Sequence, residues 1–239
     1  MTTFVLVHGA WHGAWCWFKV IPLLEKAGHT TVAVDLPSHG IDRTPTSEVS
    51  LELCAEAVCR VLDECREPVI LVGHSMGGVV ISRAAELRPG KVEKLVYLAA
   101  FLLPSGVTIL EATPPDTRAK TLASLVIKDG GHAASLRAEA LRHMFYADCD
   151  EADVALARTL LVPQAMAVSA TRLSTSSENW GRVPRFYVEC TLDNAIPIEA
   201  QRAMSLQLPC RRVITMETSH SPFLSAPGEL SDHLLELLK

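Results

Sequence analysis

One stretch of the chain constrains the fold more than any other, because a strand pattern changes into a helix pattern at a serine flanked by glycines. Pro68–Val72 is short, apolar and uncharged, which is typical of a buried strand. Gly78–Leu87 has the pattern of a helix and is followed by Pro-Gly. The connection between them, Gly73–Gly77, matches Gly-x-Ser-x-Gly and predicts a nucleophile elbow that exposes Ser75. The alternative is a glycine-rich turn whose serine has no role.

Strand-like and helix-like runs alternate along most of the 239 residues. The strand-like runs are Thr3–Val7, Thr30–Asp35, Pro68–Val72, Val92–Ala99, Arg185–Cys190 and Arg211–Met216. The helix-like runs are Trp17–Ala27, Leu51–Cys65, Gly77–Leu87, Ile198–Leu208 and Gly228–Leu238. This alternation predicts an α/β fold with a mostly parallel sheet, right-handed crossovers and helices on both faces.

Residues 104–184 interrupt the alternation, because they contain no convincing strand. Helix-like pieces such as Ala133–Phe145 and Glu151–Leu161 follow the Pro114-Pro115 and Gly130-Gly131 pairs. The stretch is too long for one crossover, so we predict a small helical cap inserted between two parts of a core, residues 1–103 and 185–239. A run of ordinary crossover helices is the alternative.

Composition excludes several classes of partner. The net charge is −5 and there is no basic run, so neither nucleic acid nor a membrane surface is expected to bind. No apolar stretch is long enough to span a membrane, and no signal peptide is expected. The seven cysteines form no CxxC pair, a usage that favours a reducing cytoplasm. No spacing predicts a metal site or a nucleotide, so we expect no cofactor.

A serine nucleophile needs a histidine to take its proton and a carboxylate to orient that histidine. Asp193 follows the strand-like run Arg185–Cys190, and His220 follows the last one, which is the expected chain order. Asp193 has an alternative role as a turn or helix-capping residue, and His220 as an exposed loop residue. His233 falls inside the C-terminal helix, where a solvated or capping role is expected.

The oxyanion of a tetrahedral intermediate needs hydrogen-bond donors. The backbone N–H of Met76, which follows the nucleophile, is one candidate, and that of Ala10, in the loop after the first strand, is the other. Among the nearby histidines, His12 is expected to form a hydrogen bond within that loop and His74 to point into the interior. His39 is expected to support a turn, with substrate contact as the alternative.

These motifs resemble a known group of proteins. The resemblance is carried by His8–Trp15 (HGAWHGAW), Gly73–Gly78 (GHSMGG), Ala99–Pro104 (AAFLLP), Asp153–Ala157 (DVALA), Cys190–Asp193 (CTLD) and Ser219-His220. Together they resemble the plant methylesterase and hydroxynitrile lyase branch of the α/β-hydrolase superfamily, over almost the whole chain. The resemblance implies an α/β-hydrolase fold with a six-stranded sheet and a small lid. It also implies a triad at Ser75, Asp193 and His220, an oxyanion hole at Ala10 and Met76, and a homodimer.

Two positions separate the chemistries of this branch. The lyases carry a threonine next to the loop histidine, where this chain has Gly9, and a lysine after the catalytic histidine, where it has Ser221. Without that cation a departing cyanide loses its electrostatic partner, so hydrolysis of a small to medium apolar ester is expected. A cofactor-free lyase or oxygenase, and a ligand-binding receptor with slow hydrolysis, are the alternatives.

The substrate pocket is expected between the cap and the carboxyl edge of the sheet. An apolar pocket suits an alkyl or aromatic ester. The expected wall residues are Trp11, Phe101, Leu125, Phe145, Tyr146, Leu160, Met166, Trp180 and Phe223.

Overall fold

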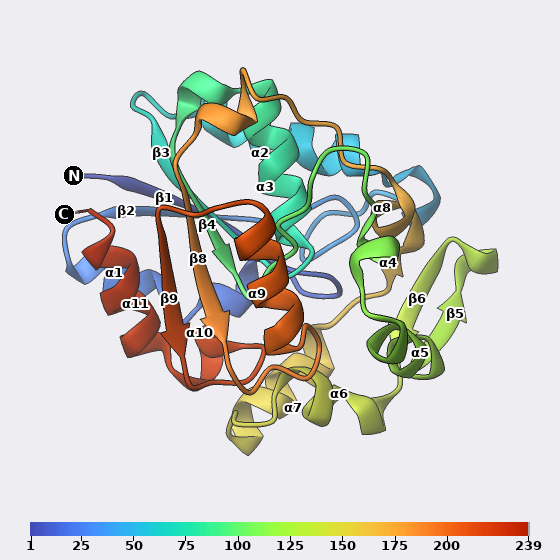
Figure 1. Ribbon diagram of the computed structural model, residues 1–239. Helices are drawn as coiled ribbons and strands as arrows, with labels where there is room; N and C mark the ends of the chain where they lie inside the picture. Colours follow the sequence, from blue (N-terminus) through green and yellow to red (C-terminus); the bar gives the residue numbers. More distant parts are fainter. Residues whose placement is uncertain (239) are drawn as a thin grey trace.

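The computed structural model describes residues 1–238 and is built around a six-stranded sheet (Figure 1). The strands are ordered β2-β1-β3-β4-β8-β9, and all neighbouring pairs are parallel. Their bounds are Thr3–Val7 (β1), Thr30–Val34 (β2), Val69–His74 (β3), Val92–Leu98 (β4), Arg185–Cys190 (β8) and Arg212–Met216 (β9). The predicted α/β fold and all six predicted strands are confirmed.

Alternate side chains of each strand pack into two separate cores. Val5, Val7 and Leu71 face helices α2 and α3, whereas Phe4 and Leu6 face α1 and α11 on the opposite side of the sheet. Because both faces are buried, the strands are continuously apolar rather than alternating. The helices of the core are α1 (Ile21–Lys26), α2 (Leu51–Glu64), α3 (Gly77–Leu87), α9 (Ile198–Gln207), α10 (Pro222–Ser225) and α11 (Pro227–Glu236).

The strand order also locates the site. The chain passes from β2 to β3 across β1, so β1 and β3 are neighbours from which the connections leave in opposite directions. Loops diverge at such a switch point and leave a crevice at the carboxyl ends of the strands. The loops after β1 and β3 are the ones that carry Ala10 and Ser75.

The first predicted helix is shorter than expected. Ala14–Trp17 forms a 3₁₀ helix, and α1 begins at Ile21 with Pro22 in its first turn. Proline is accepted in a first turn but cannot continue a helix from the preceding residues, which explains the break. The cysteines of α2 behave as predicted, since Cys54 and Cys59 are buried with the apolar side chains.

The cap, as we call residues 104–184, differs from the helical insertion predicted. It contains a three-stranded antiparallel sheet, in the order β5-β6-β7, in addition to its helices (Figure 1). The prediction of no strand was therefore wrong, and so was the helix over the first residues of Ala133–Phe145. The elements are α4 (Ile109–Ala112), α5 (Pro115–Ala123), β5 (Leu125–Lys128), β6 (Ala133–Leu136), α6 (Ala138–Phe145), α7 (Glu151–Leu160), β7 (Gln164–Ala165) and α8 (Met166–Ala170).

A hairpin signal explains the missed strands. Asp129, Gly130 and Gly131 all have positive φ, a conformation that favours glycine and turns β5 back onto β6. The flanking runs are only four residues long, too short to give a clear periodicity. As a division into domains, the core and the cap stay a prediction.

Within residues 1–238, no helix has the length and apolar character needed to cross a bilayer. The same residues contain no group of three or more histidine, cysteine, aspartate or glutamate side chains arranged to hold a metal ion.

Candidate active site

Ser75 lies at a strained turn between β3 and α3. Its φ is +53°, in the left-handed region that non-glycine residues rarely adopt. The turn is closely packed, since a Cβ on Gly73 would lie 2.7 Å from the carbonyl oxygen of Gly77. A Cβ on Gly9, in the loop after β1, would lie 2.8 Å from the Cβ of Ser75. The turn thus has the geometry of the predicted nucleophile elbow, and its glycines are explained by close approach.

His220, in the loop after β9, faces Asp193, in the loop after β8. Its Nδ1–H donates to Asp193 Oδ2 at 2.7 Å, and both side chains are almost fully buried. This contact assigns the ring proton to Nδ1 and leaves Nε2 as the basic nitrogen. The alternative of an exposed loop histidine is therefore wrong.

Asp193 is held by donors on both of its oxygens. The backbone N–H groups of Ala195 and Ile196 donate to Oδ1 at 2.7 and 2.9 Å. The Nε2 of the buried Gln201, on α9, donates to Oδ2 at 3.2 Å. These contacts satisfy a buried carboxylate and fix its orientation toward His220.

His74 points into the interior, as predicted, and packs behind His220. Its ring centroid lies 4.5 Å from that of His220, and its Nε2–H donates to the His220 carbonyl oxygen at 2.8 Å. Complete burial lowers the pKa of His74 well below its ordinary value, so its ring carries no charge to repel a protonated His220. In residues 1–238 no hydrogen bond joins Ser75 to His220, a contact that in free enzymes often forms only when substrate binds.

The two expected oxyanion donors border the same cavity as Ser75. Neither the N–H of Ala10 nor that of Met76 donates to an acceptor in residues 1–238. The carbonyl of Ala10 accepts a hydrogen bond from His12 Nδ1 at 2.7 Å, which confirms the predicted role of His12 within this loop. Burial lowers the pKa of His12 to about 4, so its ring stays neutral at neutral pH.

Trp11, the residue after Ala10, ties this loop to the cap. Its φ is +63°, and its N–H donates to Gln164 Oε1 at 3.2 Å. Its carbonyl accepts the N–H of Val162 at 3.0 Å, and its indole N–H donates to the carbonyl of Ala134 at 2.8 Å. Trp11, a strained residue next to the predicted oxyanion donor Ala10, is thereby held by three hydrogen bonds.

Gln164 was not predicted from the sequence. Its Nε2–H donates to the carbonyl of Ala165, which together with the Trp11 contact fixes the orientation of the amide. Its Oε1 also lies 3.0 Å from His39 Nε2, while His39 Nδ1 lies 2.9 Å from the carbonyl of Pro37. His39 therefore supports a turn, as expected, and does not line the cavity.

Further hydrogen bonds join the cap to the loops that carry the candidate site residues. Tyr146 O–H donates to His12 Nε2 at 2.7 Å. Asn194 Nδ2, next to Asp193, donates to the carbonyl of His143 at 3.0 Å. The N–H of Ser219, next to His220, donates to Asp148 Oδ2 at 2.8 Å, and its hydroxyl donates to the same carboxylate.

A cavity of about 110 Å³ opens beside Ser75. Its apolar wall comes from the cap and from the loops that carry the candidate site residues, and Arg118 is the one charged side chain among its lining residues. Those residues are Ala10, Trp11, Ser75, Met76, Phe101, Ile109, Leu110, Thr113, Arg118, Thr121, Leu122, Leu125, Met144, Phe145, Gln164, Met166, Ser169, Ala195 and Ile196.

Five of the nine predicted wall residues line this cavity: Trp11, Phe101, Leu125, Phe145 and Met166. Trp180 does not, because its indole N–H donates to Tyr97 Oη at 2.9 Å and the guanidinium of Arg185 stacks on its ring. Phe223 packs behind His74, with ring centroids 4.8 Å apart.

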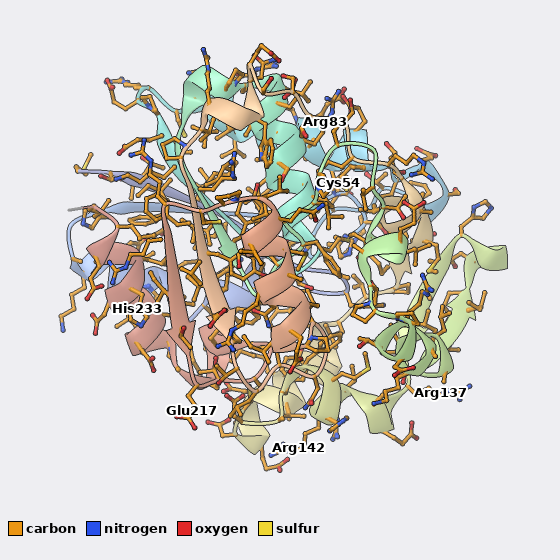
Figure 2. The ribbon with its side chains drawn as sticks, viewed as in Figure 1. Cys54, Arg83, Arg137, Arg142, Glu217 and His233 are labelled. Carbon is orange, nitrogen blue, oxygen red and sulfur yellow. The ribbon has the colours of Figure 1, made fainter. Side chains whose placement is uncertain are left out.

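The remaining two wall predictions are also outside the lining. Tyr146 is directed at His12, and Leu160 is partly exposed at the end of α7. His233 lies on α11 beside Glu229 and does not line the cavity; in Figure 2 its side chain is on the opposite side of the view from Arg137 of the cap.

The family model of the alpha/beta hydrolase family matches residues 4–233. Methylesterase 2 of Arabidopsis thaliana is 36% identical over 249 residues, which cover 98% of this chain and 95% of the relative. Putative methylesterase 11 of the same plant, described as chloroplastic, is also 36% identical, but the chain spans only 64% of that relative's length. Among solved structures, polyneuridine aldehyde esterase superposes with a TM-score of 0.89 at 28% identity, with 100% of both chains covered.

The chain belongs to the alpha/beta hydrolase family. Its similarity to methylesterases and to polyneuridine aldehyde esterase confirms the predicted branch and makes it a carboxylesterase-like hydrolase.

Proposed function

We propose that the chain is a serine esterase that hydrolyses small to medium apolar esters through Ser75, His220 and Asp193. One observation carries the proposal. The strained serine and two free backbone N–H groups border an apolar cavity, and the His220 of a buried His220–Asp193 pair packs against His74, the residue before the serine. A cavity of this size and polarity suits an alkyl or aromatic ester group.

The proposed reaction has two steps. Ser75 attacks the ester carbonyl while His220 Nε2 takes its proton, and Asp193 stabilises the charged imidazole. The N–H groups of Ala10 and Met76 stabilise the oxyanion, and His220 then protonates the leaving alcohol. A water activated by His220 releases the acid from the acyl-enzyme.

The lyase alternative is disfavoured at two positions. A β-branched side chain at Gly9 would meet His74 Nδ1 and Ser75 Cβ, each 2.8 Å from the Cβ position. Ser221 is fully buried and supplies no positive charge for a cyanide leaving group. The receptor alternative keeps the same pocket and predicts ligand binding without turnover.

The test compares the wild type with Ser75→Ala on p-nitrophenyl butyrate, with Ser205→Ala on α9 as a matched control. We expect Ser75→Ala to lose turnover by at least about a thousandfold and Ser205→Ala to retain it. A fluorophosphonate probe should label the wild type and Ser205→Ala but not Ser75→Ala, which tests the nucleophile even where the ester is a poor substrate. Labelling that persists in Ser75→Ala would contradict the proposal.

Binding without labelling or turnover in the wild type would favour the receptor alternative. The homodimer and the cytoplasmic location expected from the sequence stay predictions.

A further inference from the structure

A single charge lies in the wall of an otherwise apolar cavity. Arg118, on α5, lines the cavity together with Ser75 and is only partly exposed. No other residue of the lining is charged. An apolar pocket with one placed charge usually uses that charge to orient a ligand.

The guanidinium of Arg118 has no carboxylate partner within residues 1–238. Its Nη1–H donates to the carbonyl of Leu110 at 2.7 Å, and the other N–H groups of the guanidinium have no acceptor in these residues. Among the other arginines of the cap, Arg172 pairs with Glu111 at 2.7 Å and Arg142 with Glu151 at 3.1 Å. Arg137, Arg158 and Arg182 also have no carboxylate partner in these residues, but none of them lines the cavity. A half-buried cation without a counter-charge is costly, and an anion in the cavity would offset that cost.

Two hydroxyl groups of the lining already have acceptors. The hydroxyls of Thr113 and Thr121, both in the lining, donate to helix carbonyls at 2.8 and 2.9 Å. The planar guanidinium is the group best shaped to bind a carboxylate through two parallel hydrogen bonds.

We propose that Arg118 binds a carboxylate carried by the substrate at a distance from the scissile ester. The preferred substrates are then esters that bear a free carboxylate at their far end, with an apolar spacer along the cavity wall. This proposal rests on the ester hydrolysis proposed above and names the substrate class of the same site. The carboxylate can belong to the acyl part, as in the half-ester of a dicarboxylic acid, or to the alcohol part.

The experiment compares matched pairs of neutral and anionic esters. Monomethyl and dimethyl esters of dicarboxylic acids, with an increasing number of methylenes, test a carboxylate on the acyl side. Butyrate esters of hydroxy acids, against their methylated forms, test the alcohol side. The proteins are the wild type, Arg118→Gln, Arg118→Lys and the control Arg137→Gln, whose side chain points outward from the cap (Figure 2).

For the wild type we expect kcat/KM to favour the anionic member by at least about tenfold at one best spacer length on one of the two sides. Arg118→Gln should abolish this preference, because KM should rise by at least about tenfold more for the anionic ester than for its neutral partner. Arg118→Lys should retain part of the preference, and Arg137→Gln all of it. The preference should also decrease as salt is added.

Two results would overturn the proposal. One is a wild type that favours the neutral ester at every spacer length on both sides. The other is an Arg118→Gln variant that slows both members of each pair equally, which would mean that Arg118 only ties α5 to Leu110. Hydrolysis of neutral esters that depends on Ser75 would stand in either case, so this failure is distinct from failure of the proposed esterase activity.

Discussion

Two parts of the cap border the same cavity but are attached to the core in different ways. The inner cap, residues 138–165, contains α6, α7 and β7, and the outer cap, residues 109–131, contains α4, α5 and β5 (Figure 1). The inner cap buries Leu141, Met144 and Phe145 from α6 alone, in the core cluster that also holds α1 and α11. In the outer cap Ile109 of α4 is the one buried residue, and neither α5 nor β5 has any.

The hydrogen bonds follow the same division. The inner cap contacts three of the four loops that carry candidate site residues, through Gln164 to Trp11, through the His143 carbonyl to Asn194, and through Asp148 to Ser219. Within residues 1–238, the outer cap forms one hydrogen bond with the core, from Thr46 Oγ1 to Asp129 Oδ2 at 2.8 Å, and that contact is exposed.

This difference suggests a division of tasks. The inner cap supports the catalytic loops, so changes there should alter the rate of the chemical step. The outer cap supplies Arg118, Leu122 and Leu125 to the cavity wall, so changes there should alter the choice of substrate.

The largest expected effect concerns His12, which accepts a hydrogen bond from Tyr146 of the inner cap. Burial lowers the pKa of His12 from 6.5 to about 4 in the folded protein. Between these values the unfolded chain binds more protons, so the free energy of unfolding decreases as the pH falls through this range and changes no further below about 4. The expected loss is about 3 kcal/mol.

Urea unfolding at several pH values between neutral pH and pH 4 measures this effect. His12→Asn, which does not titrate, should lose this part of the pH dependence, although the buried His8 and His74 contribute in the same direction. The matched control is His143→Asn at an exposed position of the inner cap, which should behave as the wild type. An unchanged pH dependence in His12→Asn would contradict the prediction, because it would show that folding does not lower the pKa of His12.

The next effect concerns Gln164. Gln164→Ala removes the acceptor of the Trp11 N–H and should loosen the neighbouring Ala10 donor, with a fall in kcat of about tenfold to a hundredfold. Because Gln164 acts through another residue, affinity for a boronic acid that forms a tetrahedral adduct with Ser75 should fall more than KM rises. Gln207→Ala, at an exposed position on α9, is the control. A Gln164→Ala variant that loses thermal stability and kcat/KM but keeps its kcat would indicate a purely structural role.

The core and the cap also differ in how much of their structure could be predicted from the sequence. The apolar strands and the elbow are local patterns that can be recognised in the sequence. The candidate site residues Asp193 and His220 follow strands in a fixed order, so their location in the fold could be predicted from their positions along the chain. Gln164 could not, because its role depends on β7 lying against the loop after β1, and nothing in the local sequence specifies that approach.

The aromatic residues show the same limit. Trp180 and Phe145 are both large apolar side chains in or beside the cap, yet one stacks under Arg185 and the other lines the cavity. Burial is favourable for both side chains, so the sequence predicts that they are buried but does not predict which residues they contact. The sequence alone does not distinguish Arg118 from the other arginines of the cap, because its position in the cavity wall depends on how the cap folds.

A smaller effect is expected for Asp148, which accepts two hydrogen bonds from Ser219 beside His220. Asp148→Ala should lower kcat about threefold to tenfold, because the base loses part of its positioning while the Asp193 contact remains. Asp148→Asn keeps an acceptor for the Ser219 N–H and should recover part of the loss. Asp232→Ala, exposed on α11, should have no effect. A loss in Asp148→Ala that Asn does not reduce would assign the effect to charge rather than to positioning.

The smallest effect is expected on the outer cap. Thr46→Val removes its one hydrogen bond with the core among the described residues, and since that contact is exposed we expect less than about a twofold change in kcat. Hydrogen exchange followed by mass spectrometry measures the attachment directly. Amides of residues 109–131 should exchange faster than those of residues 138–165 in the wild type, and faster still in Thr46→Val. Equal protection of the two parts would contradict the comparison, since α4 and α5 would then be as firmly attached as the helices that hold the catalytic loops.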